Sequence, residues 1–290
     1  GRSGVVLTAA VSLSAAFAYT LHDYLMVRVV RGVAVLSALF RVQVVGLVVL
    51  GPLWLLIGES PSGGDEWRAA LLAASTGPIE IVALACLLKG LSVGKLSVVG
   101  PLAALGGGFG AAFAVALGEP VEGLAAIGLP LAVAGAVLAS IERSPDGERR
   151  VKATAGAGWG LLCALIWGVE PIVIAEATLL PSLSVVTIGR LASVVFLAPF
   201  TALFGGFALP RAFARRSGVA GVLDVAGYFL WVAGTAIGPV ATASVLVAQT
   251  GTMSAVFGTV ALRERPTRIQ VVGIAATAVA VTLLALEGAG

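Results

Sequence analysis

Eight charged or polar side chains interrupt long apolar runs, and most are of types that bind cations or exchange protons. They are His22, Asp23, Arg41, Glu80, Glu170, Arg190, Asp224 and Gln249. If these runs cross a bilayer, each charged residue costs about 2.5–3.5 kcal/mol on insertion scales and therefore requires a reason. Charges inside membrane segments commonly mark ligand or proton pathways. This set is the first candidate for a functional site.

Helical spacing groups several of these side chains with aromatic rings, because residues three or four apart share one face of an α-helix. Three such faces are Tyr19, His22 and Asp23; Cys163, Trp167 and Glu170; and Asp224, Tyr228 and Trp231. An acid beside aromatic rings is typical of a cavity that binds a cation. These faces, together with Glu80 and Gln249, are the predicted sites of substrate binding or proton coupling.

Structural alternatives stay open for several of these residues. Arg41 and Arg190 are interpreted as structural partners of a carboxylate or a helix end rather than as substrate contacts. Tyr228 and Trp231 could be interfacial or packing aromatics. His22, near the end of its run, could simply be solvated instead of handling a proton.

The balance of charges within the runs is uneven. The four acids are Asp23, Glu80, Glu170 and Asp224, and the two bases are Arg41 and Arg190. Even if both arginines are paired, two carboxylates remain. An unpaired buried carboxylate either takes up a proton or binds a cation, so the sequence indicates a coupling proton or an amine-bearing ligand. Glu80, at the middle of its run, is the hardest acid to explain as purely structural.

The composition predicts the elements that must hold these residues. Hydrophobic residues make up 59% of the 290 residues and charged residues only 11%, against about 25% charged in a soluble domain. The chain is therefore predicted to be an all-α integral membrane protein with ten transmembrane helices. Cys86 and Cys163 lie inside apolar runs and are expected to be free thiols.

The predicted helices follow one another with short connections. Their approximate bounds are 5–27, 32–57, 67–88, 93–117, 121–141, 153–177, 183–204, 218–237, 239–262 and 267–286. A polar linker, 142–152, divides the chain into a first five-helix repeat, 1–141, and a second, 153–290. No cofactor, metal site or nucleic-acid partner is expected, because the basic residues lie in short loops between the runs.

The two halves look like two copies of one plan. A shift of 145 residues places Ala116–Glu119 on Ala261–Glu264, and a shift of 148 places Tyr19 on Trp167 and His22 on Glu170. A shift of 149 pairs the two arginines of the runs. Because each half has an odd number of helices, the copies are predicted to be inverted relative to one another, which is an architecture of transporters.

The basic residues of the loops gather on one predicted side. That side holds Arg28, Arg31, Lys89, Lys95, Arg143, Arg149, Arg150, Lys152, Arg211, Arg215, Arg216, Arg263, Arg265 and Arg268. The other side holds only Arg2 and Arg68. Cytoplasmic loops carry the excess of Lys and Arg. We therefore expect a multi-pass protein of the cell (inner or plasma) membrane, with the linker 142–152 cytoplasmic and both termini outside.

Several segments resemble a known family. The stretch from Gly238–Ser244 through Leu262–Pro266 is similar to the end of an EamA-type repeat, Leu117–Pro120 is similar to the same element in the first half, and Gly158–Gly168 is similar to a repeat start. The resemblance, to the EamA-like family of the drug/metabolite transporter superfamily, implies ten helices, a central cavity and secondary transport of small metabolites, often outward. Family members are expected to have cytoplasmic termini, the opposite of what the loop charges predict.

These observations favour a secondary active transporter, not an enzyme. The leading hypothesis is proton-linked export of small polar metabolites such as amino acids or amines. The alternative is efflux of lipophilic organic cations, held by an acid among aromatic rings. A membrane-embedded enzyme is less consistent with the sequence, which has a single histidine and no HExxH motif. The expected partners are the lipid bilayer, a small-molecule substrate and protons; the sequence leaves the substrate, the coupling ion and the oligomeric state open.

Overall fold

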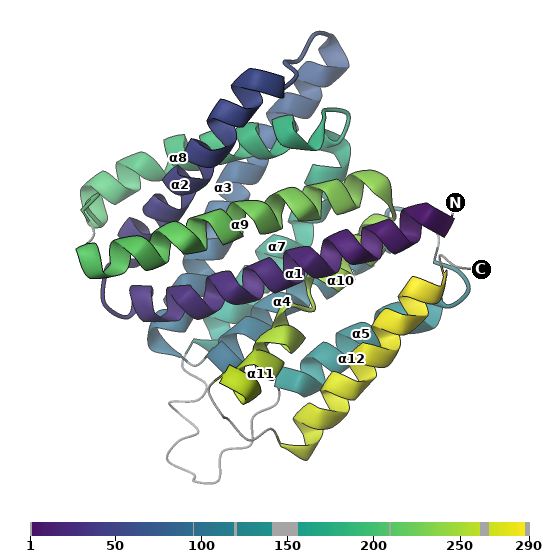
Figure 1. Cartoon of the computed structure of the whole chain (residues 1–290). Helices are drawn as coiled ribbons and strands as arrows, with labels where there is room; N and C mark the ends of the chain where they lie inside the picture. Colours follow the sequence, from purple (N-terminus) through teal and green to yellow (C-terminus); the bar gives the residue numbers. More distant parts are fainter. Residues whose placement is uncertain are drawn as a thin grey trace.

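The computed structural model describes residues 2–94, 96–118, 121–140, 156–208, 210–261 and 267–287. These residues form helices joined by short loops, and none of them lies in a strand (Figure 1). The helices are α1 (Arg2–Val30), α2 (Val35–Ile57), α3 (Gly64–Val93), α4 (Leu96–Ala116), α5 (Ala125–Ser140), α7 (Ala157–Ala177), α8 (Ser182–Phe204), α9 (Arg211–Ile237), α10 (Val240–Val247), α11 (Thr250–Ala261) and α12 (Arg268–Glu287). The predicted all-α class is confirmed.

Five of the described helices are long and apolar enough to cross a membrane, namely α2, α3, α7, α8 and α9. Their most apolar windows have a mean hydropathy between 1.5 and 2.0. At 1.5 Å per residue, a helix of 21 to 30 residues covers the ~30 Å hydrocarbon core. These five helices support the predicted multi-pass membrane protein by their length and composition, and shorter apolar stretches occur in α4, α5 and α12.

The ninth predicted helix, 239–262, is not continuous. It is divided into α10 and α11 by a turn at Ala248 and Gln249. At the turn, the N–H of Gln249 donates to the carbonyl of Leu246 and the N–H of Gly251 donates to that of Ala248, both at 3.2 Å. These three-residue steps replace the four-residue steps of an α-helix. Discontinuous helices occur in transporters where backbone lines a cavity.

Helices from the two halves pack against one another in a pattern that persists when the halves are exchanged. The most extensive contacts pair α1 with α9, α3 with α7, α4 with α7 and α5 with α12, and α2 packs on α8 and α9. Here the helices of the two halves are matched in chain order: α1 with α7, α2 with α8, α3 with α9, and α5 with α12. Under this exchange the α1–α9 pair becomes the α7–α3 pair, and the α5–α12 and α2–α8 pairs stay the same. Figure 1 shows α1 running along α9, and α5 beside α12 at one edge of the molecule.

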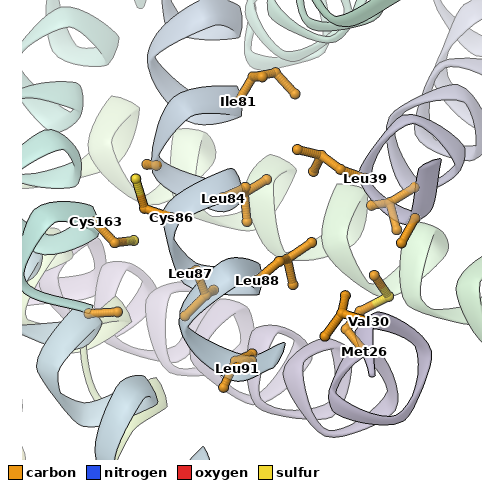
Figure 2. Packing of buried hydrophobic residues seen from close by; sticks show 14 of the residues in the cluster. Met26, Val30, Leu39, Ile81, Leu84, Cys86, Leu87, Leu88, Leu91 and Cys163 are labelled. Carbon is orange, nitrogen blue, oxygen red and sulfur yellow. The ribbon is translucent and has the colours of Figure 1, made fainter. Parts of the chain in front are cut away.

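Helix α3 is central to the apolar core. Its leucines, among them Leu84 and Leu88, lie between Cys163 of α7 and Met26 of α1 (Figure 2). Nearer the start of α3, Gly77 lies against α8. A Cβ added to Gly77 would come within 2.6 Å of both the carbonyl oxygen of Gly189 and the nitrogen of Ser193. This close approach brings two polar segments of α3 and α8 together in the interior.

Loops with basic residues meet at one end of the helices. The guanidinium of Arg31, between α1 and α2, donates to the carbonyl of Gly94 at 3.0 Å. Gly32 lies beside Phe213 in the first turn of α9. At the opposite end, the hydroxyl of Ser184 donates to the carbonyl of Glu59 at 2.7 Å. The predicted linker 142–152 lies outside the described residues.

Candidate functional site

A buried arginine joins the two halves of the chain. Arg190 of α8 is completely buried; its Nη1 lies 2.9 Å from Oδ2 of Asp224 on α9, and its Nη2 lies 3.7 Å from Oε1 of Glu80 on α3. Nη1 also donates to Oε1 of Gln43 on α2. The guanidinium carbon lies 5.4 Å from the ring centre of Tyr228, a cation–π distance. One base thus holds two of the predicted acids.

A third predicted acid is connected through a tyrosine. The hydroxyl of Tyr228 lies 2.9 Å from Oγ1 of Thr76 and 3.3 Å from Oε1 of Glu170. The Thr76 hydroxyl proton is used in a 2.8 Å bond to the carbonyl of Ala73. Because a hydroxyl carries one proton, Tyr228 can donate to only one of its two partners. All three bonds form together only when Glu170 carries a proton and donates it to Tyr228.

The site also contains a cavity of about 70 Å³, which is large enough for several water molecules. Six residues of the predicted set line it: Tyr19, His22, Asp23, Glu80, Trp167 and Trp231. They come from α1, α3, α7 and α9, and further walls are provided by α4 and by the turn between α10 and α11. Glu80 is the predicted residue that both lines the cavity and contacts Arg190.

The histidine and two of the aromatic residues are buried, which contradicts a solvated His22 and interfacial aromatics but agrees with the alternative of packing aromatics. His22 is 2% exposed, and its Nδ1 lies 3.1 Å from Oδ1 of Asp23. Tyr228 and Trp231 are buried against one another in an edge-on arrangement with ring centres 6.0 Å apart. They are therefore interior residues rather than interfacial aromatics.

Arg41 does not join the buried cluster. It is exposed on α2, and no ion pair connects it to an acid among the described residues. The expected symmetry between Arg41 and Arg190 is therefore wrong with respect to their environment. Gln43, two residues further along α2, instead faces inward and binds Arg190. A shift of two residues on a helix turns a side chain by about 200°, which moves it from one face to the other.

Because Arg41 is outside the buried cluster, the excess of negative charge there is larger than the sequence predicted. Four buried acids now face one buried arginine, so if all four are ionised three negative charges are left uncompensated, or two if His22 is protonated. The oxygens Oε2 of Glu80, Oε2 of Glu170 and Oδ1 of Asp224 accept no hydrogen bond from the described protein atoms. Buried polar atoms are normally satisfied. These oxygens therefore require water, a proton or a ligand cation.

Gln249 lies at the helix break and not on the cavity wall. Its Nε2 donates to the carbonyl of Val245 at 3.0 Å, and its Oε1 accepts from the hydroxyl of Thr252 at 3.1 Å. Its neighbour Thr250 lines the cavity instead. The side chain of Gln249 thus stabilises the broken backbone.

The helix break is connected to α1 by two threonines. The hydroxyl of Thr20 lies 3.3 Å from the carbonyl oxygen of Thr250, and the hydroxyl of Thr250 lies 3.4 Å from the carbonyl oxygen of Ala16. The stronger bond of Thr250 is to the carbonyl of Val247, at 2.7 Å. A cavity wall with irregular backbone is thereby held against a continuous helix.

Three residues of the site were not among the predicted site residues. Gln43, Thr76 and Ser244 are all buried; Ser244 belongs to the cavity lining, and its hydroxyl has no hydrogen-bond partner among the described atoms. Gln43 could have been found, because an amide inside an apolar run is unusual. A buried threonine or serine gives no such signal, since either can bond to its own helix backbone.

An all-helical fold with a cavity lined by both halves of the chain, and with acids in its wall, is compatible with a secondary transporter. Residues 154–286 match the EamA-like transporter family. The predicted resemblance is thereby confirmed for the second half of the chain, and it indicates a membrane transporter of the drug/metabolite type. Because the matching family consists of transporters, the match argues against the alternative of a membrane-embedded enzyme.

A solved crystal structure is similar to the whole chain. The TM-score is 0.75 at 18% sequence identity, and the superposition covers 100% of this chain and 99% of the other. At this identity the likeness concerns the fold alone. The comparison with curated proteins returned no match.

Proposed function

We propose that this protein is a proton-linked secondary transporter that exports small polar metabolites such as amino acids or amines. The observation that carries the proposal is the position of Glu80. One of its oxygens contacts Arg190 at 3.7 Å, the other has no partner among the described atoms, and the side chain lines the cavity. A proton or a substrate ammonium group can neutralise this carboxylate, and the two would compete for it.

The cluster around Arg190 supports a coupling role. The guanidinium can neutralise one acid fully, and the shorter distance to Asp224 makes that acid its principal partner. Glu80 and Glu170 are left to exchange protons, with Tyr228 bonded to Glu170 and close to Arg190. Proton uptake at one end of this cluster would change the charge that a bound substrate meets at the cavity.

The exchange symmetry of the helix contacts supports two repeats, 1–141 and 153–290, joined by the linker 142–152. We infer that the repeats are inverted, so that the cavity between them opens alternately to either side. The end that gathers the basic loops would face the cytoplasm. Outward transport is the direction that the family resemblance favours.

A second candidate function is efflux of lipophilic organic cations. It is favoured by the two carboxylates that line the cavity, Asp23 and Glu80, beside the indole rings of Trp167 and Trp231. Aromatic faces attract cations, and the attraction increases when water is excluded. Uptake by proteoliposomes of a lipophilic cation and of polar amines, measured in parallel, distinguishes the two candidates.

The test of proton coupling is the Glu80→Gln variant in two proteoliposome assays. With an imposed pH gradient, accumulation of substrate should be lost, while exchange of labelled for unlabelled substrate without a gradient should persist. Glu176→Gln is the matched control, because Glu176 is an exposed acid paired loosely with Arg68 at 3.5 Å. Full pH-driven accumulation by Glu80→Gln would contradict the coupling role of this residue.

A further inference from the structure

We propose that, of the two substrate classes named above, the cavity selects amines: it takes a small organic monocation that carries a neutral hydrogen-bond acceptor and rejects zwitterionic amino acids. The inference rests on the proposed transport function, since it names the substrate class of the same cavity. It depends on which charged and polar groups line the cavity and which are turned away from it.

The charged lining of the cavity is acidic. Asp23 and Glu80 line it, and neither an arginine nor a lysine does so among the described residues. The imidazole of His22 is already bonded to Asp23 at 3.1 Å. Arg190 is outside the lining and is held by Asp224 and Gln43. A substrate carboxylate would therefore meet two acids, while the nearby bases His22 and Arg190 are already engaged by acids of the protein. A substrate ammonium group would instead be attracted.

The start of α11 does not provide a compensating anion site. Thr250, its first residue, lines the cavity together with Val247 and Ala248 at the end of α10. The end of one helix carries partial negative charge and the start of the next carries partial positive charge. At this break the two lie side by side, so their fields largely cancel. The acids then dominate the potential in the cavity.

The cavity also presents donors without acceptors. Trp231 is 7% exposed, and its Nε1 has no hydrogen-bond partner among the described atoms. An indole N–H can only donate, so its missing partner is an acceptor. The hydroxyl of Ser244, also on the wall and 2% exposed, lacks a partner as well. A hydroxyl, ether or carbonyl oxygen on the substrate would satisfy these groups without placing a negative charge near Glu80.

The shape of the cavity limits the size of the cation. Its volume is about 70 Å³, and one wall is formed by Gly100, Ala103, Ala104 and Gly107 of α4. Gly107 is in close contact with α10, because an added Cβ would overlap Ala248 and the carbonyl of Ser244. This wall of α4 therefore cannot move closer to α10. A small aliphatic amine fits these limits better than an extended aromatic cation.

Four related compounds separate the parts of this recognition. Valinol has an ammonium group and a hydroxyl; valine adds the negative charge of a carboxylate; 1,2-dimethylpropylamine lacks the hydroxyl; and 3-methyl-1-butanol lacks the ammonium group. Binding is measured by isothermal titration calorimetry on the full chain in detergent at pH 7. We expect valinol to bind at least about tenfold more tightly than valine and 3-methyl-1-butanol, which change the charge that the acids meet. Against 1,2-dimethylpropylamine, which lacks only a neutral hydrogen bond, the expected difference is about two- to tenfold.

Two variants assign the recognition to residues. Glu80→Gln should weaken the binding of valinol and of 1,2-dimethylpropylamine by about tenfold each, because both ammonium groups lose the same ionic partner. Trp231→Phe should weaken the binding of valinol but leave the binding of 1,2-dimethylpropylamine unchanged. Phenylalanine keeps an aromatic face and removes only the N–H that the hydroxyl of valinol would accept from. The matched controls are Glu176→Gln and Trp159→Phe, which alter exposed residues of α7.

The substrate proposal is overturned if valinol does not bind or if valine binds as tightly as valinol. It is also overturned if Trp231→Phe weakens the binding of valinol and of 1,2-dimethylpropylamine equally. Transport assays keep this outcome separate from the transport function. Proton-driven uptake of a zwitterion or a neutral solute would sink the substrate class and leave proton-linked transport intact. Tight binding of valinol without any pH-driven flux would support the substrate class and contradict proton-linked transport.

Discussion

The carboxylate of Asp224 lies 2.9 Å from the guanidinium of Arg190, and both side chains are completely buried. The second acid at this guanidinium, Glu80, is 3.7 Å away and reaches the cavity. The shorter pair is therefore expected to stabilise the fold, and the longer pair is the one that a proton or ligand can replace. Several measurable consequences depend on this difference.

Replacement of Arg190 by alanine should destabilise the protein strongly. Removing one partner of a buried ion pair costs about 3–5 kcal/mol, because the remaining charges stay buried without compensation. The control is Arg41→Ala, which alters the exposed arginine at the related position of α2 and should change stability by less than about 0.5 kcal/mol. Thermal unfolding in detergent measures both. Equal effects of the two substitutions would mean that the ion pairs of Arg190 contribute nothing to the fold.

The two acids at Arg190 should respond differently to neutralisation. Asp224→Asn removes the charge of the short ion pair and should cost up to about 3–5 kcal/mol, the range for breaking a buried pair. Glu80→Gln keeps the shape of the side chain and removes a costly charge, so its unfolding temperature should stay close to that of the parent protein. Denaturation of the two purified variants under identical conditions compares them. A larger loss for Glu80→Gln would reverse the assignment of structural and exchangeable partners.

Gly77→Ala should separate α3 from α8. The added methyl group would lie 2.6 Å from backbone atoms of Gly189 and Ser193, which cannot move away independently of their helix. Overpacking of this kind costs about 1–3 kcal/mol. Gly158→Ala is the control, since no atom lies within 4 Å of its added methyl group and alanine favours the helix. A neutral Gly77→Ala variant would show that the two helices are not held at this distance.

Thr250→Val should loosen the break between α10 and α11. The substitution keeps the volume but removes the hydroxyl that binds the carbonyl of Val247 at 2.7 Å and lies 3.4 Å from that of Ala16. A loss of about 1 kcal/mol is expected. Thr187→Val in the continuous helix α8, where the hydroxyl bonds to the carbonyl of Leu183, should cost less. Hydrogen exchange near residues 248–251 should rise only in the Thr250 variant; unchanged exchange there would refute a role in holding the break.

The orientation in the membrane can be tested with a cysteine at Ser144, in the linker outside the described residues. The loop charges predict a cytoplasmic linker, so an impermeant thiol reagent added to intact cells should not label Ser144→Cys. The native Cys86 and Cys163 are 5% and 0% exposed, so they provide an unreactive background. Efficient labelling of intact cells would place the linker outside and the termini in the cytoplasm.

The sequence alone was sufficient for the class of protein and for most helix positions. Hydropathy is a local property of each segment, and a helix of about 20 apolar residues is long enough to cross a bilayer whatever its neighbours are. For the same reason the acids could be recognised without a structure, because a charge such as Glu80 in an apolar run is costly in every arrangement. The resemblance of the second half to the EamA-like family also depended on local segments.

Tertiary structure decided which of these side chains meet. A shift of 149 residues places Arg41 on Arg190 in the sequence, yet one is exposed and the other is buried between acids from two helices. Their difference depends on how far each helix is rotated about its axis, which is fixed by packing with neighbouring helices. The break at Ala248 and Gln249 likewise depends on bonds to α1 and close contact with α4. Hydropathy is a property of each segment, whereas rotation, contact and the closing of a cavity are properties of the assembled helices.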